Sequence, residues 1–147
     1  MGAKGIEESN VMPVMESRLS MMSLGVKDLK ISRRFYSEGL GFIERQQTNE
    51  FIVFYDLNAM TLSLYPGENL AAEVEMLANG EGFRDFTLSH NVRTEEEVDE
   101  LLSAAVFAGA RLIKKPSRAD WGGYSGYFSD PDGFLWEVAT GSFLDPD

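Results

Sequence analysis

The sequence predicts an α+β domain made of two copies of a strand–helix–three-strand unit, a tandem βαβββ arrangement. In each half of the chain a strand-like segment runs directly into a capped helix, at Asp28 and again at Thr94. Three short strand-like segments follow each helix, separated by turn-forming residues. When Val26 and Asp28 are placed on Val92 and Thr94, the elements of the two halves occur in the same order.

Length and composition fit one folded domain. The chain has 147 residues, of which 44% are hydrophobic, and it has no cysteine. The absence of cysteine excludes disulfides, thiolate metal sites and cysteine nucleophiles. It also suits a reducing compartment, so we expect a cytoplasmic protein.

The charge of the chain limits its partners. A formal net charge of -11 would repel nucleic acid and anionic lipid, so we expect neither nucleic acid nor a membrane as a partner. No apolar run approaches the roughly 20 residues of a membrane span. The first residues, MGAKGIEESN, lack the hydrophobic segment of a signal peptide. The acidity itself has two interpretations, a solvated surface or a preference for a cationic ligand.

The first half of the domain follows a polar segment. We expect a flexible tail at residues 1–18, a single domain at 19–140 and a C-terminal tail at 141–147. Within the domain, the first module covers 19–67 and begins with a strand at 19–26. A helix capped by Asp28 follows, with Ile31 and Phe35 on its apolar side, and it ends at two glycines. The segments with strand character lie at 42–47, 51–56 and 60–65.

The second half repeats this order after a connector at 68–84, in which a helical turn is expected at 71–78. The second module, 85–140, begins with a strand at 86–92. Thr94 and Glu97 form a capping box, and the helix continues to Gly109. Strands are expected at 111–115, 124–129 and 134–139, with a tight turn at Asp-Pro-Asp-Gly between the last two. The natural assembly is two curved four-stranded sheets with the helices outside.

Two segments resemble a known superfamily. LGVKDLKISRRFYSEGLGF resembles the first strand and helix of the vicinal oxygen chelate superfamily, which includes glyoxalase I, bleomycin-resistance proteins, methylmalonyl-CoA epimerase and extradiol dioxygenases. GYFSDPDGFLWEVA resembles its closing hairpin, and SHNVRTEEEVDELL resembles short glyoxalase-like proteins, mostly without an assigned reaction. The match covers about residues 19–140. It implies the glyoxalase/bleomycin resistance/dihydroxybiphenyl dioxygenase fold, with a U-shaped cleft and, usually, a homodimer.

The resemblance also implies where a metal would bind. Enzymes of this superfamily generally hold one divalent ion between the first and last strands of the two modules, with His, Gln or Glu as ligands. The equivalent positions here are four corners: Met21, Ser63, Thr87 and Glu137. Only Glu137 matches the pattern, because a thioether and two hydroxyls are poor ligands for such ions. We therefore expect no cofactor, and only weak binding of a divalent metal at Glu137.

His90 and Asn91 are candidate ligand-binding residues on the strand before the second helix. Strand alternation directs Thr87, Ser89 and Asn91 toward the cleft and His90 toward the helix layer. A bulge would reverse this, so His90, the only histidine, remains a candidate.

Glu137 is the candidate catalytic residue. A carboxylate on the inner face of a sheet is costly unless it is paired or wetted. One interpretation is that Glu137 binds a ligand or acts as a base. The alternative is a structural salt bridge to Arg93 or Arg118.

Aromatic residues near Gly122, Gly123 and Gly126 form a second candidate group. Trp121, Tyr124 and Tyr127 are candidate ligand-binding residues, because aromatics beside a cleft bind planar or cationic ligands. Strand and dimer packing is the alternative.

Two functions remain open at this point. We favour a glyoxalase-related protein that binds a small organic molecule without an intact family metal site, either as a binding protein or as a cofactor-free enzyme that uses Glu137. The alternative is a metal-dependent lyase, isomerase or dioxygenase acting on a substrate with vicinal oxygens. In both cases the expected partners are a small-molecule ligand and a second copy of the chain.

Overall fold

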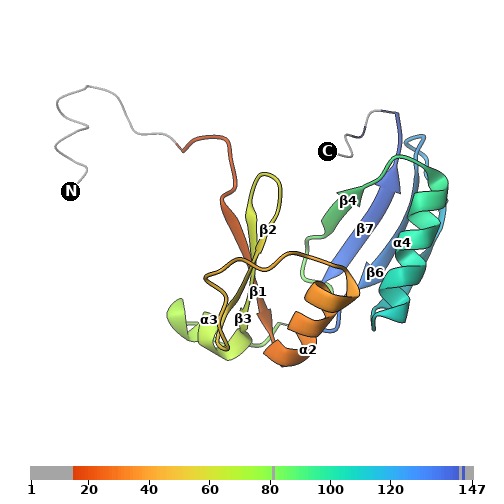
Figure 1. The fold of residues 1–147 in the computed structure, drawn as a ribbon. Coiled ribbons are helices and arrows are strands. Elements are labelled where there is room, and N and C mark those ends of the chain that lie inside the picture. The colour runs from red at the N-terminus through yellow and green to blue at the C-terminus, as the bar shows by residue number, and fades with distance from the viewer. Residues whose placement is uncertain (1–14, 81, 143, 145–147) are drawn as a thin grey trace, which may run out of the picture.

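Two sheets, one from each half of the chain, form the framework of the computed structural model, which describes residues 15–80, 82–142 and 144 (Figure 1). The first half contains β1 (Met21–Val26), α2 (Leu29–Arg34), the π-helical segment η1 (Phe35–Gly39), β2 (Val53–Asp56) and β3 (Thr61–Pro66). Its strands are ordered β1-β3-β2. The short helix α3 (Gly67–Glu73) begins the connector.

The second half contains β4 (Leu88–Asn91), α4 (Glu95–Phe107), β5 (Arg111–Arg118), β6 (Tyr124–Ser129) and β7 (Leu135–Thr140). Its strands are ordered β4-β7-β6-β5. In both sheets the first strand of the module lies parallel to the last one, β1 to β3 and β4 to β7. This shared connectivity confirms the predicted α+β fold of tandem modules.

Both helices begin where the sequence predicts. The Asp28 carboxylate accepts hydrogen bonds from the backbone N–H groups of Lys30 and Ile31. At the start of α4, Thr94 accepts from the Glu97 N–H, and the Glu97 carboxylate accepts from the Thr94 N–H. Each helix therefore begins with its free N–H groups partly satisfied.

The strand register confirms the internal repeat. Ser23 lies opposite Ser63 in the first sheet, and Ser89 lies opposite Glu137 in the second. These are equivalent pairs under the repeat alignment that places Ser63 on Glu137. The two modules therefore present corresponding side chains on corresponding faces.

A single hydrophobic core joins the two modules. It contains residues from the helix-facing sides of both sheets and from the helices: Leu24, Val26, Leu62 and Leu64 from the first sheet, Phe128, Trp136 and Val138 from the second, and Phe35, Tyr36, Val98 and Leu102 from the helices. The ring centroids of Phe35 and Phe128 lie 6.2 Å apart, so the first helix contacts the second sheet. In Figure 1, α2 accordingly lies between the two sheets.

A polar network crosses this junction. The Tyr36 hydroxyl donates to Asp130 at 2.6 Å and accepts from the Trp136 indole N–H at 3.0 Å. Asp132 accepts from the Lys27 N–H at 2.8 Å and from the Ser32 hydroxyl at 2.6 Å. The Asp-Pro-Asp-Gly turn therefore ties the last hairpin to the first helix, in addition to reversing the chain.

Several sequence expectations need correction. The strand expected at 42–47 is reduced to a single bridge between Glu44 and Tyr55, because the chain turns at residues 46–47. The first sheet therefore has three strands, not four. The helical turn expected at 71–78 is α3, which starts earlier, directly after Pro66. The first helical segment, α2 with η1, is not outside the sheets. Phe35 and Tyr36 of η1 pack on Phe128 and Trp136 of the second sheet, and Tyr36 also packs on Tyr55 of the first.

The structure describes the two terminal segments of the chain only in part. Residues 1–14 of the expected N-terminal tail, and most of the expected C-terminal tail, lie outside the described residues. In the described part, no helix combines the length and the apolar character that crossing a membrane requires.

Candidate functional site

The side of the second sheet that faces away from α4 carries a row of polar side chains. Cross-strand neighbours on this side, one from each strand, are Ser89, Glu137, Tyr127 and Lys114. Opposed residues in a sheet share a face, so these four side chains point the same way. We call them the Glu137 row.

Glu137 is half-buried and has donors on both sides. The Ser89 hydroxyl lies 3.4 Å from its carboxylate, and the Tyr127 hydroxyl donates a hydrogen bond to it. Burial first, and then the negative charge of Glu137 and this hydrogen bond, raise the pKa of Tyr127 above its ordinary value. Tyr127 therefore keeps its proton at neutral pH, and Glu137 is the acceptor of the row.

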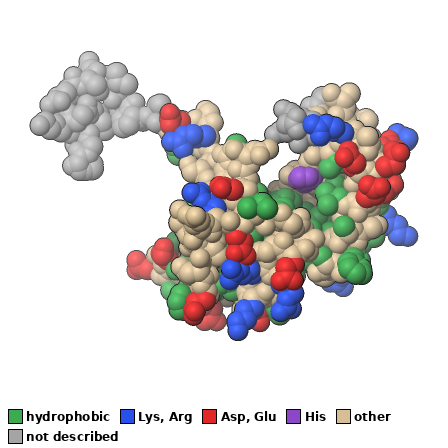
Figure 2. Space-filling view, viewed as in Figure 1, with side chains coloured by type: hydrophobic (Ala, Val, Ile, Leu, Met, Phe, Trp, Pro, Cys, Tyr) green, Lys and Arg blue, Asp and Glu red, His purple; other side chains and the backbone are tan. Residues whose placement is uncertain are grey.

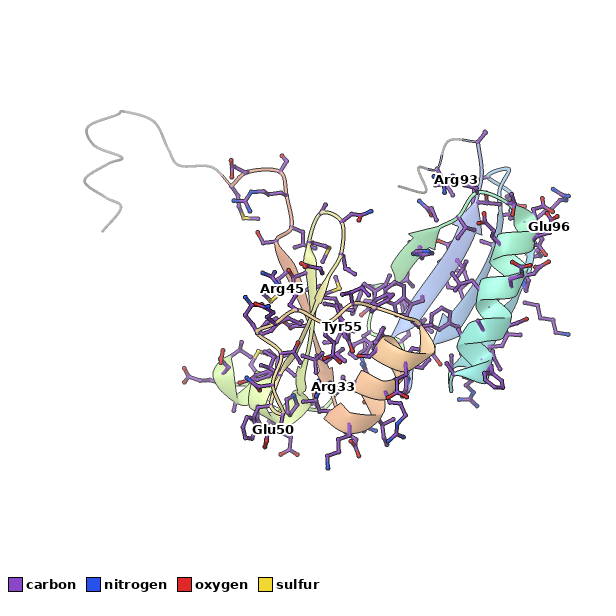
Figure 3. The ribbon with its side chains drawn as sticks, viewed as in Figure 1. Arg33, Arg45, Glu50, Tyr55, Arg93 and Glu96 are labelled. Carbon is purple, nitrogen blue, oxygen red and sulfur yellow. The ribbon has the colours of Figure 1, made fainter. Side chains whose placement is uncertain are left out.

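The first sheet carries an equivalent row of Ser23, Ser63, Phe54 and Arg45. Ser63 is fully buried and donates to the Ser23 hydroxyl at 2.7 Å. Arg45 donates to the Thr61 hydroxyl at 3.1 Å and lies 3.6 Å from the Asp56 carboxylate. Figure 3 shows Arg45 on the side of the first sheet that faces away from the second module. Each row thus ends in a cation, but only the second contains a carboxylate.

The four predicted metal corners do not converge in one chain. Met21 and Ser63 lie on the outer face of the first sheet, and Glu137 lies on the outer face of the second. Since the opposite, helix-facing sides of both sheets pack in the same core, these outer faces point away from each other. Thr87 precedes β4 and is exposed, and Met21 is 44% exposed.

The side chains at these corners do not fit a divalent cation. A thioether and hydroxyl groups are weak ligands for such ions, and Glu137 is the only carboxylate of the four. Over residues 15–80 and 82–142, no group of three or more His, Asp or Glu side chains is arranged to hold a metal.

The predicted aromatic residues do not gather around Glu137. Tyr127 belongs to the Glu137 row, but the Tyr124 hydroxyl donates to Asp99 of α4 at 2.7 Å, on the opposite side of the sheet. The ring of Trp121 lies against Gly123 and Gly141, where a β-carbon would collide with it. The two aromatic residues therefore pack at the margin of the second sheet.

His90 and Asn91 lie on opposite faces of β4. His90 lines a cavity of about 80 Å³ with Leu101, Trp136 and Val138, on the side facing α4. Figure 2 shows the histidine beside hydrophobic side chains in the hollow between the modules. Asn91 lies opposite Ala139 of β7, two residues beyond the Ser89–Glu137 pair on the same face as Glu137. The structure thus brings Asn91 and Tyr127 to the face of Glu137, and places His90 on the other face.

The structural alternative for Glu137 is a salt bridge to Arg93 or Arg118. Arg118 forms its ion pair with Glu95, at 2.8 Å, so its guanidinium is already occupied by another carboxylate. Sequence reasoning did not single out Lys114, Arg45 and Ser23 as site residues. These residues could have been found from the period-two alternation of the strands combined with the repeat. Both place them on the faces of Glu137 and Ser63.

Comparisons with known proteins agree with this fold. The sequence profile of the Glyoxalase/Bleomycin resistance protein/Dioxygenase superfamily matches residues 18–138. A glyoxalase-related enzyme from Fulvimarina pelagi is 35% identical, with a TM-score of 0.77 over 85% of this chain and 88% of that one. A hypothetical protein from S. aureus is 26% identical, with a TM-score of 0.75 over 87% of this chain and 96% of that one.

A lactoylglutathione lyase from Agrobacterium tumefaciens has the same fold at 21% identity, with a TM-score of 0.66 over 88% of this chain and 98% of that one. A search of curated proteins gives no match. The tandem modules, the parallel pairing of first and last strands in each sheet and the profile match agree. The chain therefore belongs to the glyoxalase/bleomycin resistance protein/dioxygenase superfamily.

Proposed function

We propose that this protein binds a small organic molecule against the Glu137 row, without the metal site of the metal-dependent superfamily members. The observation that carries the proposal is Glu137 itself, a half-buried carboxylate with the Tyr127 and Ser89 hydroxyls on either side, while Arg118 is paired with Glu95. Such a carboxylate has acceptor capacity left for a hydrogen-bond donor or a cation on a ligand.

The site is completed by a second copy of the chain. Within one chain nothing from the first sheet covers the face of the Glu137 row, because the polar row of the first sheet points away from it. A homodimer that sets the first-sheet row of one chain (Ser23, Ser63, Phe54 and Arg45) opposite the Glu137 row of the other would enclose a cleft between two sheets. The two rows are complementary, since the first has no carboxylate and the second has Glu137.

A cofactor-free enzyme is the second candidate function. The relative from Fulvimarina pelagi is described as a glyoxalase-related enzyme. In this chain, Glu137 would take a proton from a bound ligand. The neutral carboxyl would then release the Tyr127 hydroxyl, which would turn to donate its one O–H to the ligand oxygen that gains charge. The Tyr127–Glu137 contact is the specific observation that favours this candidate.

The test is a ligand screen in the presence of a chelator. Wild-type protein is screened by thermal shift against small organic cations, neutral carbonyl compounds and carboxylates, and hits are measured by calorimetry. We expect Glu137→Gln to weaken binding of a hit by at least about tenfold, the loss of one charge-assisted hydrogen bond.

The matched control is Glu96→Gln, because Glu96 projects from α4 away from this face (Figure 3). It should bind as the wild type does. Hits that bind Glu137→Gln and the wild type equally, or that bind only after a divalent metal is added, would contradict the proposal.

A further inference from the structure

A cavity of about 690 Å³ lies at the α3 end of the molecule, remote from the Glu137 row. The ends of β1 and β3, the start of α3, the connector and the turn before β7 form its walls. The lining residues are Gly25, Val26, Lys27, Pro66, Gly67, Glu68, Ala78, Gly80, Arg84, Asp132 and Phe134. Its volume is in the usual range for a small-molecule site, and Glu137 is not among its lining residues.

The guanidinium of Arg84 is held in a fixed position at this cavity. Its central carbon lies 4.2 Å from the ring centroid of Phe134, and its Nη2 donates to the Asp132 carbonyl at 2.9 Å. An arginine held over an aromatic ring has lost much of its side-chain entropy before a ligand arrives. Binding an anion there would therefore cost less ordering than at a free surface arginine.

Arg84 also has a donor that the protein does not satisfy. Its Nε is buried and, alone among the buried side-chain nitrogen and oxygen atoms of the described residues, has no hydrogen-bond partner. Buried donors in native proteins are nearly always paired, so an unpaired one calls for an explanation. An oxygen atom of a ligand beside the guanidinium would supply the missing acceptor.

The cavity lining carries two cations, Arg84 and Lys27, and two carboxylates, Asp132 and Glu68. Lys27 is exposed at its edge and adds a second cation. The Asp132 carboxylate is already engaged, because its two oxygens accept from the Lys27 N–H and the Ser32 hydroxyl. Glu68 is exposed at the rim and is the one lining carboxylate with no described hydrogen bond.

We propose that this cavity is a second binding site, for an organic anion whose carboxylate or phosphate lies between Lys27 and Arg84. The rest of the lining fits a small apolar or aromatic body, since Val26, Pro66, Ala78 and Phe134 contribute apolar side chains. The site is independent of the Glu137 row and does not depend on the function proposed for it.

The test compares ligands of one shape and different charge. Benzoate, phenyl phosphate, neutral benzamide and inorganic phosphate are titrated into the full-length protein by calorimetry. At least one of the two aromatic anions should bind, and benzamide should not. The stronger of the two anions identifies the acidic group, carboxylate or phosphate, for which the site is built.

Substitutions then locate the binding. Lys27→Gln and Arg84→Gln should each raise the dissociation constant by at least about tenfold, as expected for the loss of a charge-assisted contact. Glu68→Gln should lower it, because a like charge leaves the rim. Ala78→Phe should abolish binding by filling the cavity. Lys115→Gln, an exposed lysine on β5, is the matched control and should bind as the wild type does.

Lys27→Gln is the decisive variant, since Lys27 is exposed, whereas Arg84 also packs on Phe134 and its loss affects folding. Equal binding of benzamide, no binding of either aromatic anion, or an unchanged affinity in Lys27→Gln would overturn the proposal. Glu137→Gln should keep wild-type affinity for these anions. That variant separates failure of this proposal from failure of the proposed function.

Discussion

Asp130 shows how one residue of a turn motif acquires a second role in the folded chain. One carboxylate oxygen accepts from the N–H groups of Asp132 and Phe134, both at 2.9 Å, which shapes the turn. The other accepts from the Tyr36 hydroxyl of the first module. Local sequence predicts the first role through turn chemistry, but not the second, because Tyr36 is distant in sequence.

Replacing Asp130 should therefore destabilise the whole domain. Asp130→Ala leaves the buried Tyr36 hydroxyl and two N–H groups without an acceptor, so we expect a loss of about 3 kcal/mol in unfolding free energy by urea denaturation. The exposed Asp120→Ala should stay within about 0.5 kcal/mol of wild type. Equal midpoints for the two variants would show that the network contributes little.

Glu44 should contribute to the pH dependence of stability. Its hydrogen bonds from Arg33, at 2.7 and 2.8 Å, lower the pKa of the Glu44 carboxyl below its ordinary value. Because the folded-state pKa is the lower one, the stabilisation is present above the unfolded-state pKa of about 4.5 and is lost as the pH falls through the folded-state pKa.

The measurement for Glu44 is the unfolding free energy of wild type and Glu44→Gln from about pH 7 to about pH 3. The difference between them should shrink as the solution becomes more acidic. The exposed Glu50→Gln serves as the control and should follow the wild type at every pH. A constant difference for Glu44→Gln would contradict the assignment.

At the scale of elements, the capped helices and the buried strands were predictable from the sequence, whereas the edge strand expected at 42–47 was not. Asp28 and Thr94 were identified by capping chemistry alone, and the structure has both caps. The segment 42–47 has strand-like composition. The Glu44 side chain nevertheless binds Arg33 of α2 and Ser37 of η1, and pairing with β2 is limited to one bridge. Such side-chain contacts between neighbouring elements leave no periodic signal in the sequence.

The capping box of α4 has a testable contribution. Thr94→Ala removes the acceptor for the Glu97 N–H, and should cost about 1 kcal/mol of unfolding free energy. Ser103→Ala, at an exposed position in the middle of α4, is the matched control and should be neutral or slightly stabilising. Chemical denaturation of both variants gives the comparison. A Thr94→Ala value no larger than the control would mean that the cap is dispensable.

The contact between α4 and its sheet depends on Gly126. A β-carbon at this position would lie 2.7 Å from the Leu102 side chain and 3.0 Å from backbone atoms of Lys114 and Pro116. We expect Gly126→Ala to lower the unfolding free energy by about 1–3 kcal/mol, since the helix must shift to admit the methyl group. Gly80→Ala is the control, because its β-carbon would make only ordinary contacts with the Arg84 side chain. Equal stability of the two variants would contradict this packing.

At the scale of the molecule, the repeat predicted which residues share a face, but not how the modules face each other. Strand alternation and the repeat together predict that Glu137 lies on the face of its sheet directed away from the helices, at the position equivalent to Ser63. The strand register agrees. The expected convergence of the four corners assumed that both sheets of one chain turn their outer faces together. The aromatic side chains of η1, Phe35 and Tyr36, instead join the helix-facing sides of both sheets in one core, and only tertiary packing decides this.

A homodimer is therefore the expected functional unit. Light scattering after size exclusion should give twice the 16.4 kDa of one chain at micromolar concentration. Met21→Glu and Ile43→Glu place charges on exposed apolar residues of the first module, on its outer face or edge, and should shift the protein toward monomer. Phe107→Glu, on the exposed end of α4, is the control and should leave the mass unchanged. A monomeric wild type would contradict the proposal that a second copy of the chain encloses the cleft at the Glu137 row.

The central claim is that the Glu137 row works without the metal of the wider superfamily. The most direct measurement is the metal content of the protein purified without chelators, by elemental mass spectrometry, for wild type and Glu137→Gln in parallel. We expect far less than one divalent ion per chain in both. One tightly held ion per wild-type chain, lost in Glu137→Gln, would contradict it.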